Sequence, residues 1–205
     1  MNNLTFTEIR ENKIYKKAVK QLYKQAFPLN ERAPFFIINR LAHTDRAKWF
    51  AVSENDIFVG MAYCVLYKDI VYVFYLAIAE HLRGQGYGSR ILAAIRQRYV
   101  EKRIILMAEE STNAYKDVDA RLKRKQFYYA NGLVELNYKV DEFGVVYDML
   151  GFTDNSRAHK NINTNKNFLI LNFTFIFLPF LFLNAVNAFI AILYHFLFLF
   201  QLIYE

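Results

Sequence analysis

Apolar positions recur at helical spacing in the first part of the chain. Between Ile14 and Tyr23 they return every three or four residues, which lays one apolar stripe along a helix that ends before Pro28. A second helix is expected over residues 34–43, because proline is accepted in the first turn of a helix. A short alternating run at residues 4–10 predicts a strand ahead of both helices.

The middle of the chain changes to the composition of β-strands. Three runs rich in β-branched and aromatic residues are separated by short polar turns and predict an antiparallel meander, over residues 49–53, 57–67 and 71–79. Helix and strand then alternate, with a helix buried through Ile91, Leu92, Ile95 and Tyr99, a strand at 104–108 and a helix at 119–130. Asn131 and Gly132 fit a left-handed helix stop. Strands near 133–140 and 145–152 complete a mixed sheet.

A glycine-rich turn at residues 82–92 separates the meander from the helix that follows it. Gly84, Gly86 and Gly88 remove side chains, so that successive amides can point at one anion. The helix that begins near Gly86 adds its positive end, and Arg83 and Arg90 add full charges. A pyrophosphate suits so many donors in a small space.

Several interpretations compete for this turn. A nucleotide-kinase loop is rejected, because no Gly-Lys-Ser/Thr ending follows. A dinucleotide-binding turn, with Glu109 as its acidic residue, fits less well because residues 80–83 intervene after the strand and Ser89 replaces the third glycine. The strands upstream also lack crossover helices. An ordinary glycine-rich loop is the plainest alternative.

Two motifs resemble the GNAT family of N-acetyltransferases. Arg83, Gly86 and Gly88 match its acyl-CoA signature, Gln/Arg-x-x-Gly-x-Gly/Ala. Residues 127–133, Phe-Tyr-Tyr-Ala-Asn-Gly-Leu, look like its late helix-to-strand junction. The resemblance covers residues 4–152 and implies an α/β fold with a mixed, largely antiparallel central sheet flanked by helices.

The resemblance also implies a cofactor site, with acetyl-CoA as co-substrate. In the family, the strand before the turn and the strand after the next helix splay apart and expose main-chain groups to the pantetheine arm. These groups would belong to Leu76, Ala77 and Ile78, whose other interpretation is plain core strand. The pyrophosphate would bind the turn formed by Arg83, Gly84, Gln85, Gly86, Tyr87, Gly88 and Ser89.

Aminolysis of a thioester needs a neutral amine and a proton for the departing thiolate. The resemblance assigns the acid to Tyr128, and Tyr129 is expected to point elsewhere. The glutamate that histone-modifying members carry is Tyr72 here, so Glu109 or its neighbour Glu110 is the candidate base, unless the two only cap a strand in solvent.

Three further side chains are candidates around this site. Glu31, in the early turn, is expected to bind a substrate ammonium. Arg121 and Arg124 share a helical face with Tyr128 and would face the cofactor's phosphates, or else form a solvated basic face. Arg121 stands where many family members have asparagine.

Composition narrows the function classes. The net charge of +7 suits nucleic acid, a membrane surface or a polyanionic cofactor, but the basic residues fall on helix faces, and we expect no nucleic-acid partner. The single cysteine, Cys64, is expected to be a buried thiol in a reducing compartment. The histidines show no metal-ligand spacing, and no metal is expected.

The domain organisation is predicted as an acetyltransferase domain at 1–153, a polar linker at 154–166 and a hydrophobic tail at 167–205. Residues 167–204 contain no Asp, Glu, Lys or Arg. One helix of that length would be roughly 57 Å long against a hydrocarbon core of about 30 Å, so a two-span membrane hairpin is expected. Basic residues before it would keep the enzyme domain cytoplasmic. The alternative is an aggregation-prone extension without function.

The sequence as a whole predicts an acetyl-CoA-dependent N-acetyltransferase that acts on a small primary amine or an exposed amino group. A non-catalytic acyl-CoA-binding or regulatory module is the alternative, motivated by the missing strand glutamate. A peripheral membrane protein whose fold positions its tail is the third reading.

Overall fold

The computed structural model describes residues 4–29, 31–112, 117–142 and 145–152. The predicted linker and hydrophobic tail, and with them the expected membrane hairpin, lie outside the described residues. Among the residues that are described, no helix combines the length and the apolar character needed to span a membrane.

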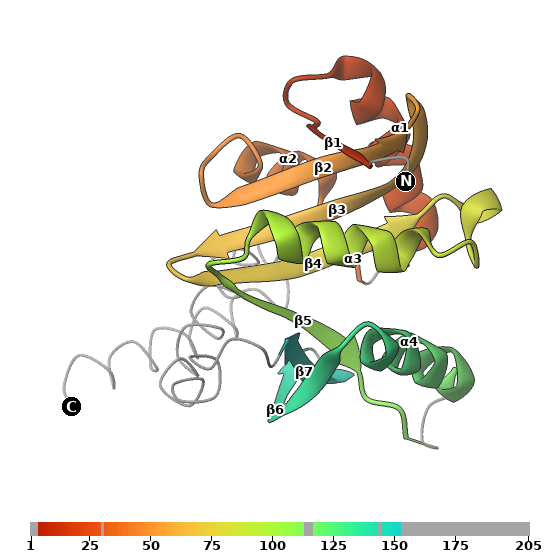
Figure 1. Cartoon of the computed structure of the whole chain (residues 1–205), viewed down its shortest axis with the longest axis vertical. Coiled ribbons are helices and arrows are strands. Elements are labelled where there is room, and N and C mark those ends of the chain that lie inside the picture. Colours follow the sequence, from red (N-terminus) through yellow and green to blue (C-terminus); the bar gives the residue numbers. More distant parts are fainter. Residues whose placement is uncertain (1–3, 30, 113–116, 143–144, 153–205) are drawn as a thin grey trace, which may run out of the picture.

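The order of elements confirms the sequence-based prediction, with a seven-stranded mixed sheet between helices (Figure 1). The strands are β1 (Thr5–Glu8), β2 (Ala47–Glu54), β3 (Ile57–Tyr67), β4 (Ile70–Ile78), β5 (Arg103–Glu109), β6 (Leu133–Glu142) and β7 (Val145–Phe152). The helices are α1 (Lys13–Ala26), α2 (Phe35–Leu41), α3 (Tyr87–Arg98) and α4 (Val118–Ala130). A 3₁₀ turn, η1 (Glu80–Leu82), was not predicted.

Helix boundaries follow the local chemistry of the chain. The side chain of Asn12 accepts hydrogen bonds from the amides of Ile14 and Tyr15 and so caps the start of α1. Gly132, with φ of 84°, ends α4 in the left-handed conformation that the Asn-Gly pair predicts.

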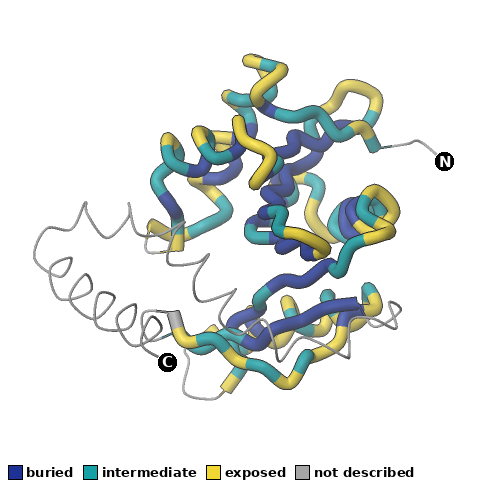
Figure 2. The backbone as a smooth tube through the Cα atoms, turned by 90° about the vertical axis from the view of Figure 1, so that its left-hand side faces the viewer, coloured by how far each residue is buried: buried dark blue, intermediate teal, exposed yellow. Residues whose placement is uncertain are grey.

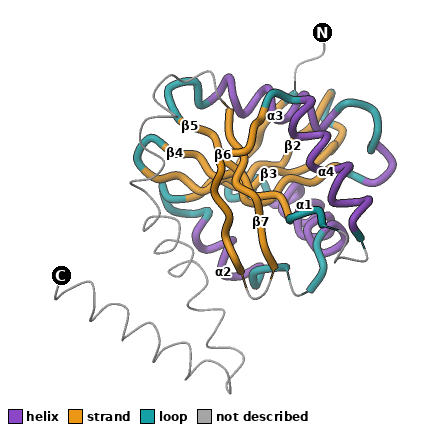
Figure 3. Tube along the Cα trace, turned by 90° about the horizontal axis from the view of Figure 1, so that it is seen from below, coloured by secondary structure: helices purple, strands orange, loops and turns teal. Residues whose placement is uncertain are grey.

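The strands are ordered β1-β2-β3-β4-β5-β7-β6 across the sheet. Every neighbouring pair is antiparallel except β4 with β5. A parallel pair needs a crossover, and α3 provides it. Figure 3 shows the strands lying between α3 on one side and α1 and α2 on the other.

Each face of the sheet has its own hydrophobic core. On one face α1 and α2 pack on Trp49, Tyr63 and Tyr75. On the other face α3 inserts Ile91, Leu92 and Ile95, all buried, and α4 adds partly buried aromatic residues. The buried segments accordingly run through the strands and along α3 (Figure 2). In the middle of the sheet, α3 packs on β4 and α4 packs on β5, and the candidate site lies where these two strands meet.

Candidate functional site

β4 and β5 part after a short parallel contact. They pair only from Ile70 with Arg103 to Tyr72 with Ile105. At this point β4 contains a bulge, because Val73 and Tyr75 oppose consecutive residues of β3 and Phe74 is the extra residue. A bulge increases the twist of its strand, while β5 turns away to pair with β7. Figure 1 shows β5 diverging from β4 beneath α3.

The parting leaves one edge of β4 unoccupied by β5 along its second half. The Ala77 carbonyl points toward β3, since a Cβ placed on Gly60 would stand 2.5 Å from its oxygen. Main-chain groups alternate sides along a strand, so those of Leu76 and Ile78 point toward the gap. Of the three predicted main-chain positions, the geometry therefore presents Leu76 and Ile78 and turns Ala77 away.

The connection from β4 to the glycine turn is short and hydrogen-bonded. The Ala79 amide donates to the Val59 carbonyl at 3.0 Å, and η1 follows at once. The Arg83 side chain returns to β4, where its Nε donates to the Ile78 carbonyl at 3.4 Å. Residues 80–83, which separate the strand from the glycine turn and so disfavour a dinucleotide-binding turn, form η1 and its C-cap residue. They place the glycine turn away from the end of β4.

The glycines of the turn serve two different physical needs. Gly84 and Gly86 have φ of 77° and 80°, a left-handed conformation that favours glycine, and a Cβ on either would meet open space. Gly88 instead allows close packing, because a Cβ there would stand 2.9 Å from Cζ of Phe127. Phe127 therefore brings α4 against the first turn of α3.

The start of α3 has the features of an anion site. Gly86 is its N-cap residue, and no side chain caps the helix. The first amides of α3 therefore keep their hydrogens for another acceptor, and the helix dipole favours a negative one. The Gln85 side chain is exposed and donates to the His81 carbonyl at 3.0 Å, so it stabilises the turn locally. Ser89 is half-buried in the first turn of α3.

Arg90 does not add its charge to the turn as expected. Its guanidinium contacts the Glu54 carboxylate at the end of β2 at 2.5 Å, and the Tyr87 hydroxyl donates to the same carboxylate at 2.7 Å. These hydrogen bonds, from Arg90 first and then Tyr87, lower the pKa of Glu54. Glu54 thus fastens α3 to the sheet, a role for which the sequence contained no signal.

The two adjacent tyrosines of α4 differ in their surroundings. Tyr128 is half-buried, its ring lies 5.3 Å from that of Phe127, and no hydrogen-bond partner for its hydroxyl lies among the described residues. Burial raises the pKa of its phenol, against a smaller opposing effect of Arg124. Tyr129 is exposed and its hydroxyl donates to Glu135. The expectation that Tyr129 points elsewhere is confirmed.

Glu109 and Arg121 form a buried ionic cluster rather than an open acid–base pair. The Glu109 carboxylate contacts Arg121 at 3.3 Å through one oxygen and Arg124 through the other. Arg121 is also held by Asp117 at 2.9 Å and by the Glu110 carbonyl at 3.2 Å. These contacts occupy the Glu109 carboxylate and the Arg121 guanidinium. The expected roles, Glu109 as a base and Arg121 on the phosphates, would require these ion pairs to open, and they stay predictions. Arg124 is part of the same pair but remains 45% exposed.

Glu31 is exposed in the turn between α1 and α2. Its carbonyl accepts a hydrogen bond of 3.0 Å from the Tyr75 hydroxyl of β4. The structure thus brings the backbone of Glu31 to the strand that borders the gap. The binding of a substrate ammonium by its carboxylate stays a prediction.

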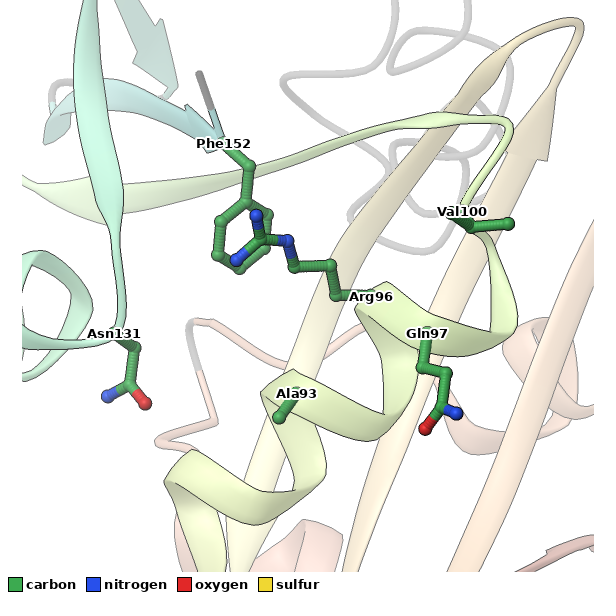
Figure 4. A pocket seen from close by; sticks show the side chains of 6 residues that line it. All are labelled: Ala93, Arg96, Gln97, Val100, Asn131 and Phe152. Atoms are coloured by element: carbon green, nitrogen blue, oxygen red, sulfur yellow. The ribbon is translucent and has the colours of Figure 1, made fainter. Parts of the chain in front are cut away.

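A surface pocket of about 390 Å³ lies away from the glycine turn. It is lined by residues of the second half of α3 and by the ends of α4 and β7, namely Ala93, Arg96, Gln97, Val100, Asn131 and Phe152 (Figure 4). The Arg96 guanidinium lies 4.7 Å from the centre of the Phe152 ring. The pocket shares no residue with the parting of β4 and β5.

The single cysteine lies in the hydrophobic core of the sheet. Cys64 is fully buried in β3, and burial raises the pKa of its thiol to about 12, so the thiol stays protonated and unreactive. In the part of the chain that the structure describes, no group of three His, Cys, Asp or Glu side chains lies close enough to hold a metal ion.

Comparison with known proteins identifies the arrangement. Residues 16–117 match the sequence model of the acetyltransferase (GNAT) family. No protein of curated function matches the chain in sequence. A GNAT-family protein from Bacteroides thetaiotaomicron superposes with a TM-score of 0.61 at 20% identity, over 82% of this chain and 95% of that one.

Two solved acetyltransferases share the fold as well. An aminoglycoside 6'-N-acetyltransferase complexed with coenzyme A gives a TM-score of 0.57 at 13% identity, over 72% of this chain and 95% of that one. The ribosomal-protein-S18-alanine N-acetyltransferase from Escherichia coli gives 0.52 at 15% identity, over 76% and 98%. At these identities the similarity establishes the fold.

The ionic cluster predicts a structural role for Glu109 that unfolding measurements can test. Replacing Glu109 with Gln leaves two guanidinium groups without their shared carboxylate, so the free energy of unfolding should fall by about 1–3 kcal/mol. Glu110→Gln is the matched control, since Glu110 pairs with the exposed Lys139 and should matter by less than about 0.5 kcal/mol. Urea unfolding of both variants measures the difference. Equal values in the two variants would contradict the structural role.

Proposed function

The chain belongs to the acetyltransferase (GNAT) family, and on that premise we propose that it transfers an acetyl group from acetyl-CoA to the nitrogen of a primary amine. The observation that supports this most is the parting of β4 from β5 next to a glycine turn whose helix start has no side-chain cap. The parted strand β4 has main-chain groups that can form hydrogen bonds with an amide-containing chain. The uncapped start of α3 has amides that can donate hydrogen bonds to a phosphate.

In this proposal acetyl-CoA binds along β4. Its pyrophosphate accepts hydrogen bonds from the amides of residues 83–89, with the exposed Arg83 as the nearby cation. The amide groups of its pantetheine arm pair with the main chain of Leu76 and Ile78, in the way that a neighbouring strand would. The thioester then lies past Leu76, deeper in the gap between β4 and β5, on the side of the sheet that holds Tyr128.

The reaction is direct aminolysis. The neutral amine nitrogen attacks the carbonyl carbon of the thioester, a C–N bond forms, and the C–S bond breaks as the thiolate leaves. The added proton on nitrogen passes to water. The Tyr128 hydroxyl donates a hydrogen bond to the sulfur as the C–S bond breaks, and the thiolate finally takes its proton from solvent.

The pKa of Tyr128 shapes this last step. Because burial raises it above the ordinary value of about 10, the phenol holds its proton at neutral pH. Full transfer to a thiolate with a pKa of about 8.5 is uphill by at least roughly 2 kcal/mol. Tyr128 therefore acts mainly by hydrogen bonding to the charge that develops on sulfur.

The acceptor is proposed to enter over the α1–α2 turn. The exposed Glu31 carboxylate attracts the substrate as an ammonium ion, and the nitrogen reacts after it loses a proton. With Glu109 held by two arginines, water is the acceptor of that proton in this proposal.

A screen of amines tests the function itself. Release of free thiol from acetyl-CoA should accelerate when the protein is given one of an alkylamine, a polyamine, an aminoglycoside or a peptide with a free amino terminus. The same compounds with their amino groups already acetylated serve as controls. Binding of CoA without acceleration by any amine would identify a non-catalytic acyl-CoA-binding module instead.

Substitution at Gly86 tests the cofactor site. Asp and Asn both tolerate positive φ and are nearly equal in size, but only Asp places a negative charge where the pyrophosphate binds. Gly86→Asp should weaken CoA binding by about 100-fold or more, and Gly86→Asn by much less. Gln85→Ala, which removes only a local bond to His81, should change the affinity little. Calorimetry that finds equal losses for Asp and Asn would refute the role of charge.

Substitution at Tyr128 tests the proton donor. Tyr128→Phe keeps the ring and deletes the proton, so kcat should fall by roughly 10²-fold while CoA affinity is nearly retained. Tyr129→Phe is the control, because its hydroxyl contacts Glu135 on the surface. Steady-state kinetics measure both variants. A similar loss in the two, or in neither, would rule out the assignment.

A further inference from the structure

The turn between α1 and α2 is held by two tyrosine hydroxyls, one from β4 and one from α1. The Tyr75 hydroxyl donates to the Glu31 carbonyl at 3.0 Å and accepts from the Ala33 amide at 3.0 Å. The Tyr23 hydroxyl of α1 donates to the Ala33 carbonyl at 2.8 Å. Both main-chain groups of Ala33 are thus held by side chains from other elements. We refer to Tyr23 and Tyr75 as the tyrosine clamp.

The clamp is rigid because its rings are buried and packed on one another. Tyr23 and Tyr75 are only 2% and 5% exposed, and their ring centres lie 5.0 Å apart at an interplanar angle of 74°. Phe27, at the end of α1, packs on Tyr75 at 4.7 Å. Burial raises the pKa of Tyr23 well above its ordinary value, so its hydroxyl remains a donor at every working pH.

Tyr75 also lies at a particular place along β4. It follows Phe74, the extra residue of the bulge, and precedes Leu76, whose main chain points toward the gap between β4 and β5. Its side chain belongs to the core under α1 and α2, opposite to the core under α3 and α4. The residue therefore joins the strand that borders the gap to the turn that carries Glu31.

We infer that Tyr75 is a positioning residue for the acceptor amine: it fixes the Glu31 turn against β4 so that the amine meets the thioester in register. The inference rests on the proposed function, since it assigns the α1–α2 turn to the acceptor. Tyr75 itself touches neither the amine nor the reacting atoms. Its effect is to hold the Glu31 backbone within hydrogen-bond distance of the strand.

This role makes a kinetic prediction that a general loss of stability does not. Tyr75→Phe keeps the buried ring and removes both hydrogen bonds to the turn. The KM for the amine found in the screen should rise roughly tenfold, the worth of one or two lost hydrogen bonds. The KM for acetyl-CoA should stay within about twofold, because the main chain of β4 is unchanged.

Tyr63→Phe is the matched control for this variant. Tyr63 is a buried tyrosine on the same face, and its hydroxyl donates to the Ile38 carbonyl of α2 at 3.1 Å, outside the Glu31 turn. The free energy of unfolding of Tyr63→Phe should fall by about as much as that of Tyr75→Phe, while the KM values for the amine and for acetyl-CoA stay unchanged. Parallel rises of both KM values in Tyr75→Phe, or the same amine effect in Tyr63→Phe, would overturn the inference.

Combining Tyr75→Phe with Glu31→Gln separates positioning from simple packing. If Tyr75 acts through the placement of Glu31, the double variant should bind the amine no worse than the weaker single variant. Effects on the amine KM that multiply would show that the two residues act independently, and would overturn the inference.

Hydrogen exchange tests the clamp without reference to any substrate. In the wild-type protein the Ala33 amide should exchange as slowly as the amides of β4, and Tyr75→Phe should speed its exchange about tenfold or more while β4 stays protected. Rapid exchange of Ala33 in the wild type would disprove the clamp. If hydrogen exchange confirms the tyrosine clamp but no amine is acetylated, the proposed function is wrong and the clamp itself is not.

Discussion

The constraint on which the site depends is the early end of pairing between β4 and β5. A sheet that opens in its middle leaves main-chain groups without strand partners, and each such group costs about 1–3 kcal/mol when it is kept from water. The structure keeps the opening by three means. The bulge at Phe74 twists β4, β7 captures β5 from Ile105 onward, and Phe127 wedges α4 against Gly88 of α3. Each of these features opposes further pairing of β4 with β5.

Several basic side chains near the opening between β4 and β5 are paired with carboxylates, although the net charge of the chain is +7. Arg90 is paired with Glu54, Arg121 and Arg124 with Glu109, and Lys125 with the buried Asp148. In the described part of the chain, Arg83 is the cation of the glycine turn that has no carboxylate partner, and it is anchored to Ile78 instead. In the proposed function, attraction for an anion there comes from helix amides and one guanidinium, which would give directional recognition of a phosphate.

The fold was predictable from the sequence because each element carries a local signal. The strands have β-branched runs, α1 has a regular stripe beginning at Asn12, and Gly132 ends α4. The glycine turn was located by the same kind of signal. The side-chain partners were not, because they depend on contacts between distant segments. Glu109 reads as an exposed acid after a strand, yet α4 brings two arginines onto it, and Glu54 gains its role only when β2 ends beside α3. The spacing of residues on α4 correctly placed Arg121 and Arg124 on one helical face, but it could not predict that the Glu109 carboxylate contacts both of them.

In the proposed reaction, the two faces of the sheet have different roles: one positions the acceptor turn, and the other carries the glycine turn and Tyr128. Alternation along β4 sends the Tyr75 side chain to the α1–α2 face, while the main chain of Leu76 and Ile78 faces the gap, and α3 and α4 hold the turn and Tyr128 on the other face. Main-chain recognition of a cofactor does not depend on which side chains the strand carries. The α1–α2 turn, by contrast, is a surface loop whose side chains can vary without disturbing β4, provided that the tyrosine clamp holds its backbone. In the proposed reaction, selectivity for the amine can therefore change through residues such as Glu31 while the acyl-CoA site stays the same, because the clamp is built from Tyr23, Tyr75 and backbone groups alone.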